Sequence, residues 1–215
     1  MNVMEPSATA GLSVKSVRRV HSRAVLTLSN GETRVMPRAL LRERPYRSGV
    51  PFDEAAFEAL LRERSYPFAL ERAVSLLAVR ARTERELRDA LHQCAYSEAV
   101  IDRVIARMNE AGYIDDADFA SQWAASRTGK GLGMRRIVME LRQKGVDAEQ
   151  IEQALGQIDE KERMESAVRA AQKAARGREL SSPADRQKVF AALMRRGYDS
   201  ASAKKAIAAL SDQEE

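Results

Sequence analysis

Three copies of one apolar pattern occupy much of the chain, and this repetition limits the possible folds more than any other feature. Each copy has a spacing of four, four, one, five and four residues, and successive copies begin 50 and then 52 residues apart. The third position holds Ala95, Gly145 or Gly197, and an apolar or aromatic residue follows it. The pattern predicts a helix, a tight turn and a second helix. The helical and post-turn positions are Leu87, Leu91, Tyr96, Ile101 and Ile105; Ile137, Leu141, Val146, Ile151 and Leu155; and Val189, Leu193, Tyr198, Ala203 and Ile207.

Tandem helical units normally stack on one another, because a unit of about 50 residues buries too little apolar surface to be stable alone. The expected fold is therefore mainly α, with three tandem three-helix repeats that form an elongated curved body. We expect these repeats at residues 67–113, 114–158 and 159–210. A body of this kind presents a long surface more readily than a pocket, which favours a macromolecular partner.

The N-terminal part has a different composition. Residues 14–20 and 23–36 are rich in β-branched residues, and Asn30-Gly31 predicts a two-residue hairpin turn. We expect a small sheet of about three strands that ends near Pro37, a short helix at residues 38–42, and a helix at residues 54–64 capped by Asp53. Pro67 is expected to break the chain before the repeats. This makes residues 13–66 a small β-rich module with one or two helices, residues 1–12 disordered, and residues 211–215 a frayed terminus.

Several residues have a predicted structural role at the ends of helices. Thr83 and Glu86 form a capping-box pattern, and Gly112 has the position of a left-handed C-cap. Gly145 and Gly197 are expected in the tight turns of the second and third repeats. Asp115, Asp116 and Asp118 could bind a divalent cation, but their place at a helix start favours capping.

No motif in the sequence predicts catalysis, a cofactor or a metal site. The two histidines, His21 and His92, have no evident carboxylate partner, and the single cysteine, Cys94, lies on an apolar helix face. Residues 129–133 (GKGLG) lack the Lys-Ser/Thr ending and the preceding strand of a nucleotide-binding loop. The glycines favour a tight turn, although their amides could also receive one phosphate or carboxylate at a helix start.

The compartment is predicted from what the sequence lacks. No apolar run approaches the ~18 residues of a membrane span, and residues 1–11 show no secretory signal pattern. We therefore expect a cytoplasmic protein with no membrane association. We also expect it to be a monomer.

Positive charge is clustered in this chain. Residues 1–51 contain nine Lys/Arg and three acids, and residues 127–144 contain six basic residues against Glu140 alone. Such clusters attract phosphate backbones or acidic protein surfaces, although each of them could also be a solvated helix face. Trp123 could stack on a base, but its helical spacing from Phe119 favours a core position. The candidate binding residues are Arg127, Lys130, Arg135, Arg136, Arg142, Lys144, Arg195, Arg196, Lys204 and Lys205.

Over residues 69–210 the chain resembles the RecX family of bacterial recombination regulators. The segments that carry the resemblance are 73–77 (AVSLL), 82–87 (RTEREL), 111–116 (AGYIDD), 119–120 (FA), 131–133 (GLG), 140–146 (ELRQKGV) and 193–198 (LMRRGY). The resemblance implies three tandem three-helix modules that bind the RecA filament and inhibit its ATPase, strand-exchange and co-protease activities.

Two other function classes remain open. Three-helix units with turn glycines also resemble helix-turn-helix modules, which would make the chain a plain DNA-binding protein with weak, salt-dependent affinity for single- or double-stranded DNA. Without the resemblance, the repeats alone would indicate a helical scaffold for an unrelated protein. An enzyme is the class that the sequence favours least.

Overall fold

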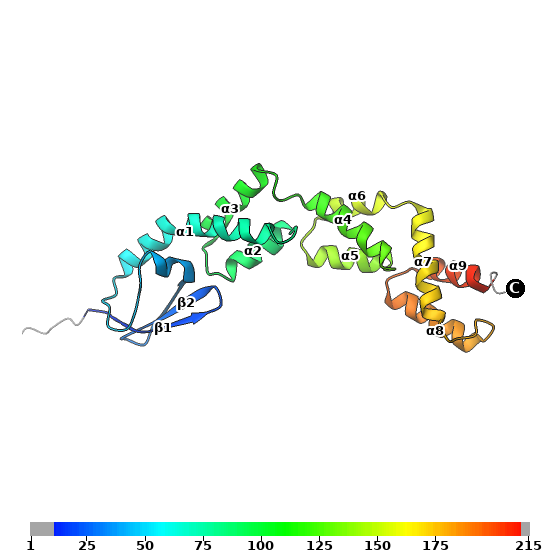
Figure 1. Cartoon of the computed structure of the whole chain (residues 1–215), viewed down its shortest axis with the longest axis horizontal. Coiled ribbons are helices and arrows are strands. Elements are labelled where there is room, and N and C mark those ends of the chain that lie inside the picture. The colour runs from blue at the N-terminus through cyan, green and yellow to red at the C-terminus, as the bar shows by residue number, and fades with distance from the viewer. Residues whose placement is uncertain (1–10, 212–215) are drawn as a thin grey trace, which may run out of the picture. The chain divides into compact units, whose positions relative to one another are not determined.

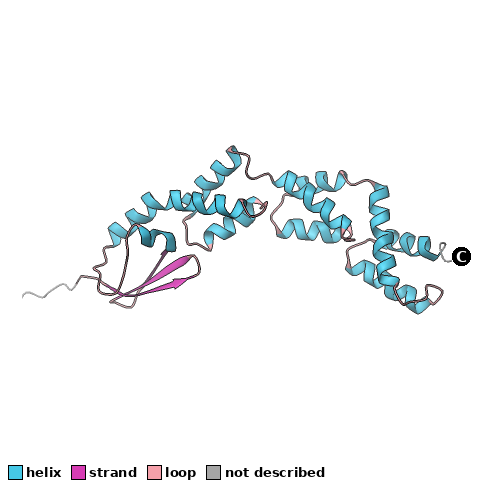
Figure 2. Cartoon of the chain, in the orientation of Figure 1, coloured by secondary structure: helices cyan, strands magenta, loops and turns pink. Residues whose placement is uncertain are grey.

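The computed structural model describes residues 11–211, which contain three strands, one 3-10 helix and nine α-helices (Figures 1 and 2). Its contacts divide the chain into two compact units. The first unit comprises the described residues up to Ala81 together with Leu87–Tyr113, and the second comprises Arg82–Glu86 and the described residues from Ile114 onwards. The disorder and fraying expected at residues 1–10 and 212–215 lie outside the described residues.

A three-stranded antiparallel sheet opens the first unit. Strands β1 (Val14–Val20), β2 (Arg23–Leu28) and β3 (Thr33–Pro37) lie in sequence order, and the 3-10 helix η1 (Arg38–Arg42) follows directly. Alternate residues of β2 point into the core, as expected for a sheet with one buried face. Leu12 also packs against this core, and its carbonyl accepts a hydrogen bond from Phe52, so the ordered chain begins before the residue predicted. The buried residues of the core are Val14, Ala24, Leu26, Leu28, Met36, Leu40, Tyr46, Phe52 and Phe57.

The hairpin between β2 and β3 is present, but its loop is longer than predicted. The Leu28 N–H donates to the Glu32 carbonyl at 2.8 Å, and the Gly31 N–H donates to the Leu28 carbonyl at 3.0 Å. The loop therefore has three residues, and of these only Gly31 has positive φ, at 89°. A type I turn followed by a left-handed glycine produces this loop, and Asn30 does not need the strained conformation that a two-residue loop would require.

The break expected at Tyr66 and Pro67 is wrong, because α1 (Glu54–Leu77) runs through both residues as one helix of 24 residues. A proline inside a helix removes one backbone hydrogen bond and costs about 3 kcal/mol. Residues on both sides of it are buried, with Phe57 in the sheet core and Ala73 in the first repeat. This burial offsets the cost of the proline. The boundary that we expected between residues 66 and 67 falls inside α1.

The eight remaining helices confirm the mainly α fold and the helix positions predicted from the repeat. They are α2 (Glu84–His92) and α3 (Glu98–Glu110); α4 (Asp116–Gly129), α5 (Met134–Gln143) and α6 (Ala148–Gly156); and α7 (Glu160–Ala175), α8 (Pro183–Arg195) and α9 (Ser200–Ser211). The repeated apolar positions are buried in all three copies, except for Leu155, which is half-buried. In Figure 1, α7 crosses α8 and α9, and all three pack around one core.

The third position of the repeat is a left-handed turn in every copy. Ala95, Gly145 and Gly197 have φ values of 65°, 84° and 89°. A left-handed residue reverses the chain at a helix end and lets the next amides bond to the last turn of the helix. The small residues at this position are therefore explained by backbone geometry, and Ala95 adopts the conformation at some steric cost.

The second unit contains two equivalent hydrogen bonds that join the start of one helix to the end of another. The Thr83 hydroxyl, at the start of α2, donates to the Lys144 carbonyl at the end of α5 at 2.7 Å. At the equivalent place one repeat later, the Gly133 N–H donates to the Arg196 carbonyl at 2.9 Å. In both places a group at the start of one helix bonds to a carbonyl at the end of another, which satisfies a backbone group that a helix end leaves unpaired.

Candidate functional site

Glu140 of α5 is the centre of an ion-pair network in the second unit. Its Oε2 accepts hydrogen bonds from Arg127 Nε at 2.8 Å and from Trp123 Nε1 at 3.1 Å, and its Oε1 accepts one from Arg136 Nε at 3.2 Å. Burial alone would raise the pKa of Glu140, but the guanidinium groups of Arg136 and Arg127 and the indole N–H outweigh burial and leave this pKa below its usual value. Two of the candidate cations, Arg127 and Arg136, are therefore bound within the fold.

Lys144 is also engaged inside the second unit. Its ammonium group binds the Glu86 carboxylate at 2.5 Å and lies 4.3 Å from the centroid of the Trp123 ring. Phe119 stacks on the same ring at 5.6 Å between centroids. Trp123 packs against the core of the second repeat and donates its N–H to Glu140. The structure therefore supports the core interpretation of Trp123 over a base-stacking role.

The other candidate cations of the second repeat face solvent. Arg135 and Arg142 are exposed, and Met139 between them is 39 % exposed. Residues at these spacings share one side of a helix, so they form a stripe along α5 that we call the α5 stripe. In total, six candidate cations are exposed and form no ion pair within residues 11–211: Lys130, Arg135, Arg142, Arg195, Lys204 and Lys205.

The first turn of α5 carries the charge that a helix start disfavours. It contains no acidic residue, and Arg135 and Arg136 follow directly after Met134. A positive charge near a helix N-terminus costs about 0.3–1 kcal/mol, because the helix dipole is positive there. Folding alone gives no reason for Arg135 at this position, since its side chain has no ion pair among the described residues.

The third repeat contributes a second group of cations. Arg196 is equivalent to Lys144 and is likewise engaged, because its Nη1 donates to the Gly131 carbonyl at 3.3 Å. Arg195, Lys204 and Lys205 are exposed on α8 and α9. Lys144 and Arg196, which precede the turn glycines at equivalent positions, are therefore both engaged within the second unit, and the exposed cations lie at other positions.

The glycine-rich turn at residues 129–133 does not leave its amides open for an anion. Gly131 N–H donates to the Thr128 carbonyl, and Gly133 N–H donates to Arg196. The Arg135 amide in the first turn of α5 donates to the Gly197 carbonyl at 3.1 Å. The hypothesis of a phosphate or carboxylate bound by these glycine amides is wrong, because the Gly131 amide is paired within its own turn and the Gly133 and Arg135 amides are paired with carbonyls of the third repeat.

The acidic residues at the start of α4 act as caps, and they cap two different helices. Asp115 Oδ1 accepts from the Asp118 amide at 2.8 Å, which caps α4 itself. Asp116 Oδ1 accepts from the Glu84 amide at 3.0 Å, so it caps the start of α2 instead of its own helix. Burial raises the pKa of Asp116. Within residues 11–211 no group of three His, Cys, Asp or Glu side chains could hold a metal ion.

Further predicted residues have structural partners. Thr83 Oγ1 accepts from the Glu86 amide at 3.2 Å, which is one half of the predicted capping box. Gly112 has a φ of 69° after the end of α3. The expectation that His92 lacks a carboxylate partner is wrong, because its Nε2 lies 2.9 Å from Glu98 Oε1. Cys94 is buried, and its thiol donates to the Ala90 carbonyl at 3.3 Å.

Comparison with protein-family models finds three consecutive matches. The models describe the first three-helix domain of RecX at residues 69–108, the second at 115–155 and the third at 160–207. These ranges cover more than half of the chain. None of the described helices combines the length and apolar composition needed to span a membrane.

Curated relatives agree with the family models. The chain is 41% identical over 160 residues to "Regulatory protein RecX" of Mycolicibacterium smegmatis, an alignment that covers 71% of this chain and 82% of the relative. It is 38% identical over 112 residues to the Escherichia coli protein of the same name, with 47% of this chain and 68% of the relative covered. The match to the Amycolatopsis mediterranei relative, at 43% identity, covers 45% of this chain and 56% of that protein.

Solved structures have the same fold. A crystal structure of the regulatory protein RecX superposes with a TM-score of 0.63 at 22% identity and covers 90% of this chain and 98% of its own. RecX from Lactobacillus salivarius also gives a TM-score of 0.63, at 23% identity, with 68% of this chain and 96% of that one covered. Three consecutive domain matches and a relative aligned over most of its length lead to one conclusion. This chain belongs to the RecX family of regulatory proteins.

Proposed function

We propose that this chain regulates homologous recombination and DNA repair, including the SOS response, by binding the RecA nucleoprotein filament in the cytoplasm. Binding would inhibit the ATPase, strand-exchange and co-protease activities of the filament, and the chain would act as a monomer. The regulatory role follows from membership of the family, and the partner and the inhibition are the proposed part.

The α5 stripe carries the proposal. Arg135 and Arg142 are exposed cations without an ion pair among the described residues, and the exposed Met139 adds an apolar contact between them. Protein interfaces favour Arg and Met over Lys and Glu, so this stripe has the composition of a docking surface. Arg135 sits where the helix dipole disfavours it, which indicates that it serves a partner and not the stability of the fold.

A RecA ATPase titration tests the proposal. The purified chain is added to RecA on single-stranded DNA, and hydrolysis is expected to fall at stoichiometric or lower amounts. Charge reversal of the stripe, R135E together with R142E, should raise the concentration needed for half-inhibition about tenfold, which corresponds to about 1.4 kcal/mol of lost binding. An acidic residue at position 135 suits the helix dipole, whereas one at position 142, in the last turn of α5, does not, so circular dichroism must show that the variant is folded.

The matched control is R62E in α1. Arg62 is also exposed and has no ion pair among the described residues, but it lies outside the second unit. Unchanged inhibition by R62E together with weakened inhibition by the stripe variant would support a specific surface. If the natural chain binds the RecA filament but ATP hydrolysis by RecA does not change, the proposed inhibition is overturned.

The alternative is a DNA-binding protein built from helix-turn-helix-like modules. In that case R135E with R142E should weaken binding to bare DNA by the same factor as it weakens inhibition of the RecA ATPase. Binding to DNA should also weaken steeply with salt, with a slope of about −3 on single strands for four phosphate contacts.

A further inference from the structure

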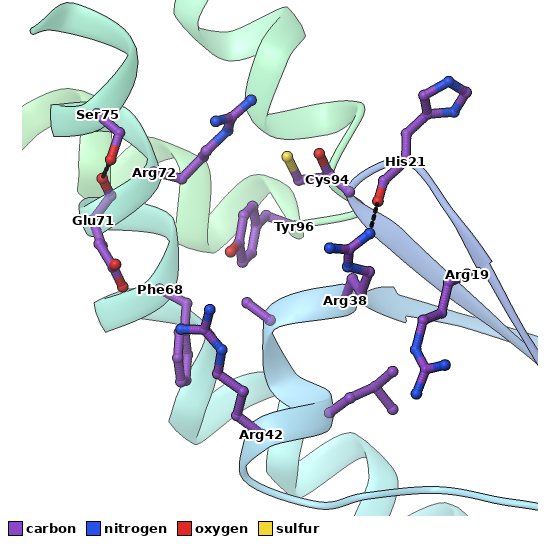
Figure 3. A pocket seen from close by; sticks show the side chains of 13 residues that line it. Arg19, His21, Arg38, Arg42, Phe68, Glu71, Arg72, Ser75, Cys94 and Tyr96 are labelled. Atoms are coloured by element: carbon purple, nitrogen blue, oxygen red, sulfur yellow. Dashed lines mark hydrogen bonds between the residues drawn. The ribbon is translucent and has the colours of Figure 1, made fainter.

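A pocket of about 560 Å³ lies within the first unit, lined by the N-terminal module and the first repeat (Figure 3). Its walls come from β1, the turn after β1, η1, α1 and the turn between α2 and α3. Four arginines and one acidic residue line it, and we call it the arginine pocket. These residues are Arg19, Arg38, Arg42, Arg72 and Glu71.

The arginines of this pocket are short of anionic partners. Arg19, Arg42 and Arg72 form no ion pair within residues 11–211, whereas Arg34 and Arg64 in the same unit bind carboxylates at 2.8 Å and 2.6 Å. Arg38 is held in place by a hydrogen bond from its Nη1 to the His21 carbonyl at 3.1 Å, as Figure 3 shows. Like charges that share one hollow repel one another, and a bound anion would relieve this repulsion.

Tyr96 adds a neutral donor to the same pocket. Figure 3 draws its ring between Arg72 of α1 and the Arg38 and Arg42 side chains of η1. The ring is buried, but the hydroxyl has no hydrogen-bond partner among residues 11–211. The equivalent Tyr198 of the third repeat places its hydroxyl 2.9 Å from Ser166 Oγ. A tyrosine hydroxyl keeps its proton at neutral pH and can donate to an anion, and burial raises the pKa of Tyr96 further.

We propose that the arginine pocket binds a backbone phosphate of single-stranded nucleic acid. Guanidinium groups pair with phosphate oxygens through two parallel hydrogen bonds, and a tyrosine hydroxyl donates a further one. The aromatic rings of Phe68 and Tyr96 also line the pocket, and basic grooves with aromatic side chains are the usual way to bind single strands. This proposal goes beyond the filament surface, because it concerns the first unit and does not involve the α5 stripe.

The charge around the pocket favours a polymer over an isolated phosphate or a short acidic peptide. Lys15, Arg18 and Arg23 on β1 and β2 are exposed and have no ion pair among the described residues, so the sheet carries further positive charge outside the pocket, with Arg18 and Arg23 on the face opposite to Arg19. A nucleic-acid backbone carries a charge on every nucleotide and can meet both regions, whereas a single phosphate can occupy only the pocket.

Fluorescence anisotropy with a labelled oligothymidylate tests the proposal on the full chain in the absence of RecA. The variant R42Q with R72Q should reduce the slope of log affinity against log salt by about 0.7, since the pocket holds one phosphate and each phosphate contact on a single strand contributes about 0.7. Y96F removes only the hydroxyl and should weaken binding at fixed salt by about threefold, the effect expected for one lost hydrogen bond. R62Q, a matched change on the exposed side of α1, should leave the slope unchanged, and E71Q should tighten binding.

Three outcomes would overturn the proposal. The first is an unchanged slope for R42Q with R72Q while circular dichroism shows a folded chain. The second is that the pocket variants lose affinity for labelled polyglutamate but keep the full affinity for the oligonucleotide, which would assign the pocket to an acidic peptide. The third is that inorganic phosphate binds in the pocket but does not displace the oligonucleotide. Because RecA is absent, a failure here is independent of the filament proposal.

Discussion

The junction between the second and third repeats depends on the absence of a side chain at Gly197. A Cβ placed there would lie 2.4 Å from the Arg136 amide nitrogen and 2.5 Å from its Cβ, closer than a Cβ approaches such atoms in proteins. The same residue has a φ of 89°, which a residue with a side chain adopts only at a cost. The substitution G197A therefore adds conformational strain and separates the turn from the start of α5.

The expected loss of stability is the sum of three contributions. An alanine in the left-handed region destabilises the folded state by about 1–2 kcal/mol. Alanine also lowers the conformational entropy of the unfolded chain, which offsets about 0.4–1 kcal/mol of this loss. Separation of the turn from α5 breaks the hydrogen bond of Gly133 to Arg196 and that of Arg135 to Gly197, each worth about 0.5–1.5 kcal/mol. The free energy of unfolding of the second unit should therefore fall by about 2–4 kcal/mol.

Gly177 supplies the control, because it lies in the same unit with a φ of 71°, and a Cβ placed there would meet no atom within 4 Å. G177A should cost about 1 kcal/mol or less, from strain alone. Urea unfolding followed by circular dichroism measures both variants, and hydrogen exchange at the Gly133 and Arg135 amides reports on the junction itself. Equal losses for G197A and G177A, with unchanged exchange at these amides, would refute the close contact as the reason for this glycine.

Two further changes test other elements of the fold. A95G should raise the free energy of unfolding by up to about 1 kcal/mol, because Ala95 has a φ of 65° that glycine adopts without steric cost; urea unfolding that shows a loss would contradict this. The low pKa of Glu140 in the folded chain means that its contribution to stability is present above the ordinary glutamate pKa and lost as the pH falls through the folded value. E140Q should remove this part of the acid dependence, measured as the midpoint of urea unfolding against pH, and an unchanged pH profile would show that Arg127 and Arg136 do not stabilise the carboxylate.

Local patterns predicted most of the helices correctly. The repeat placed the second and third helices of each module to within a few residues, because apolar periodicity and capping residues act over short stretches of chain. The small residue at the third position of the repeat (Ala95, Gly145 or Gly197) correctly predicted a turn, since positive φ is a property of the local backbone. The sheet and η1 were also recognised, although the loop after β2 has one more residue than Asn30-Gly31 alone predicts.

The errors arose where distant residues decide the outcome. Pro67 stays inside α1 because both ends of that helix are buried, a benefit that propensity alone does not include. Asp116 caps α2, which begins 32 residues earlier in the chain. The ten candidate cations look alike in sequence, yet Arg127, Arg136, Lys144 and Arg196 are bound within the second unit.

The sequence showed an excess of positive charge in residues 1–51, but it gave no sign of the arginine pocket. Its residues come from β1, η1, α1 and the turn after α2, and each arginine by itself resembles an ordinary solvated side chain. Only packing of the N-terminal module against the first repeat places them around Tyr96.

The amino-acid sequence by itself determined the three-helix repeats, their left-handed turns and the family, because these depend on residue types at fixed short spacings. Tertiary structure alone decided which cations are engaged and which are free, where Asp116 acts, and that α1 continues through Pro67. The physical reason is that ion pairing, capping and burial stabilise the fold only between groups that lie close together in space. The sequence does not state which distant residues the fold brings together.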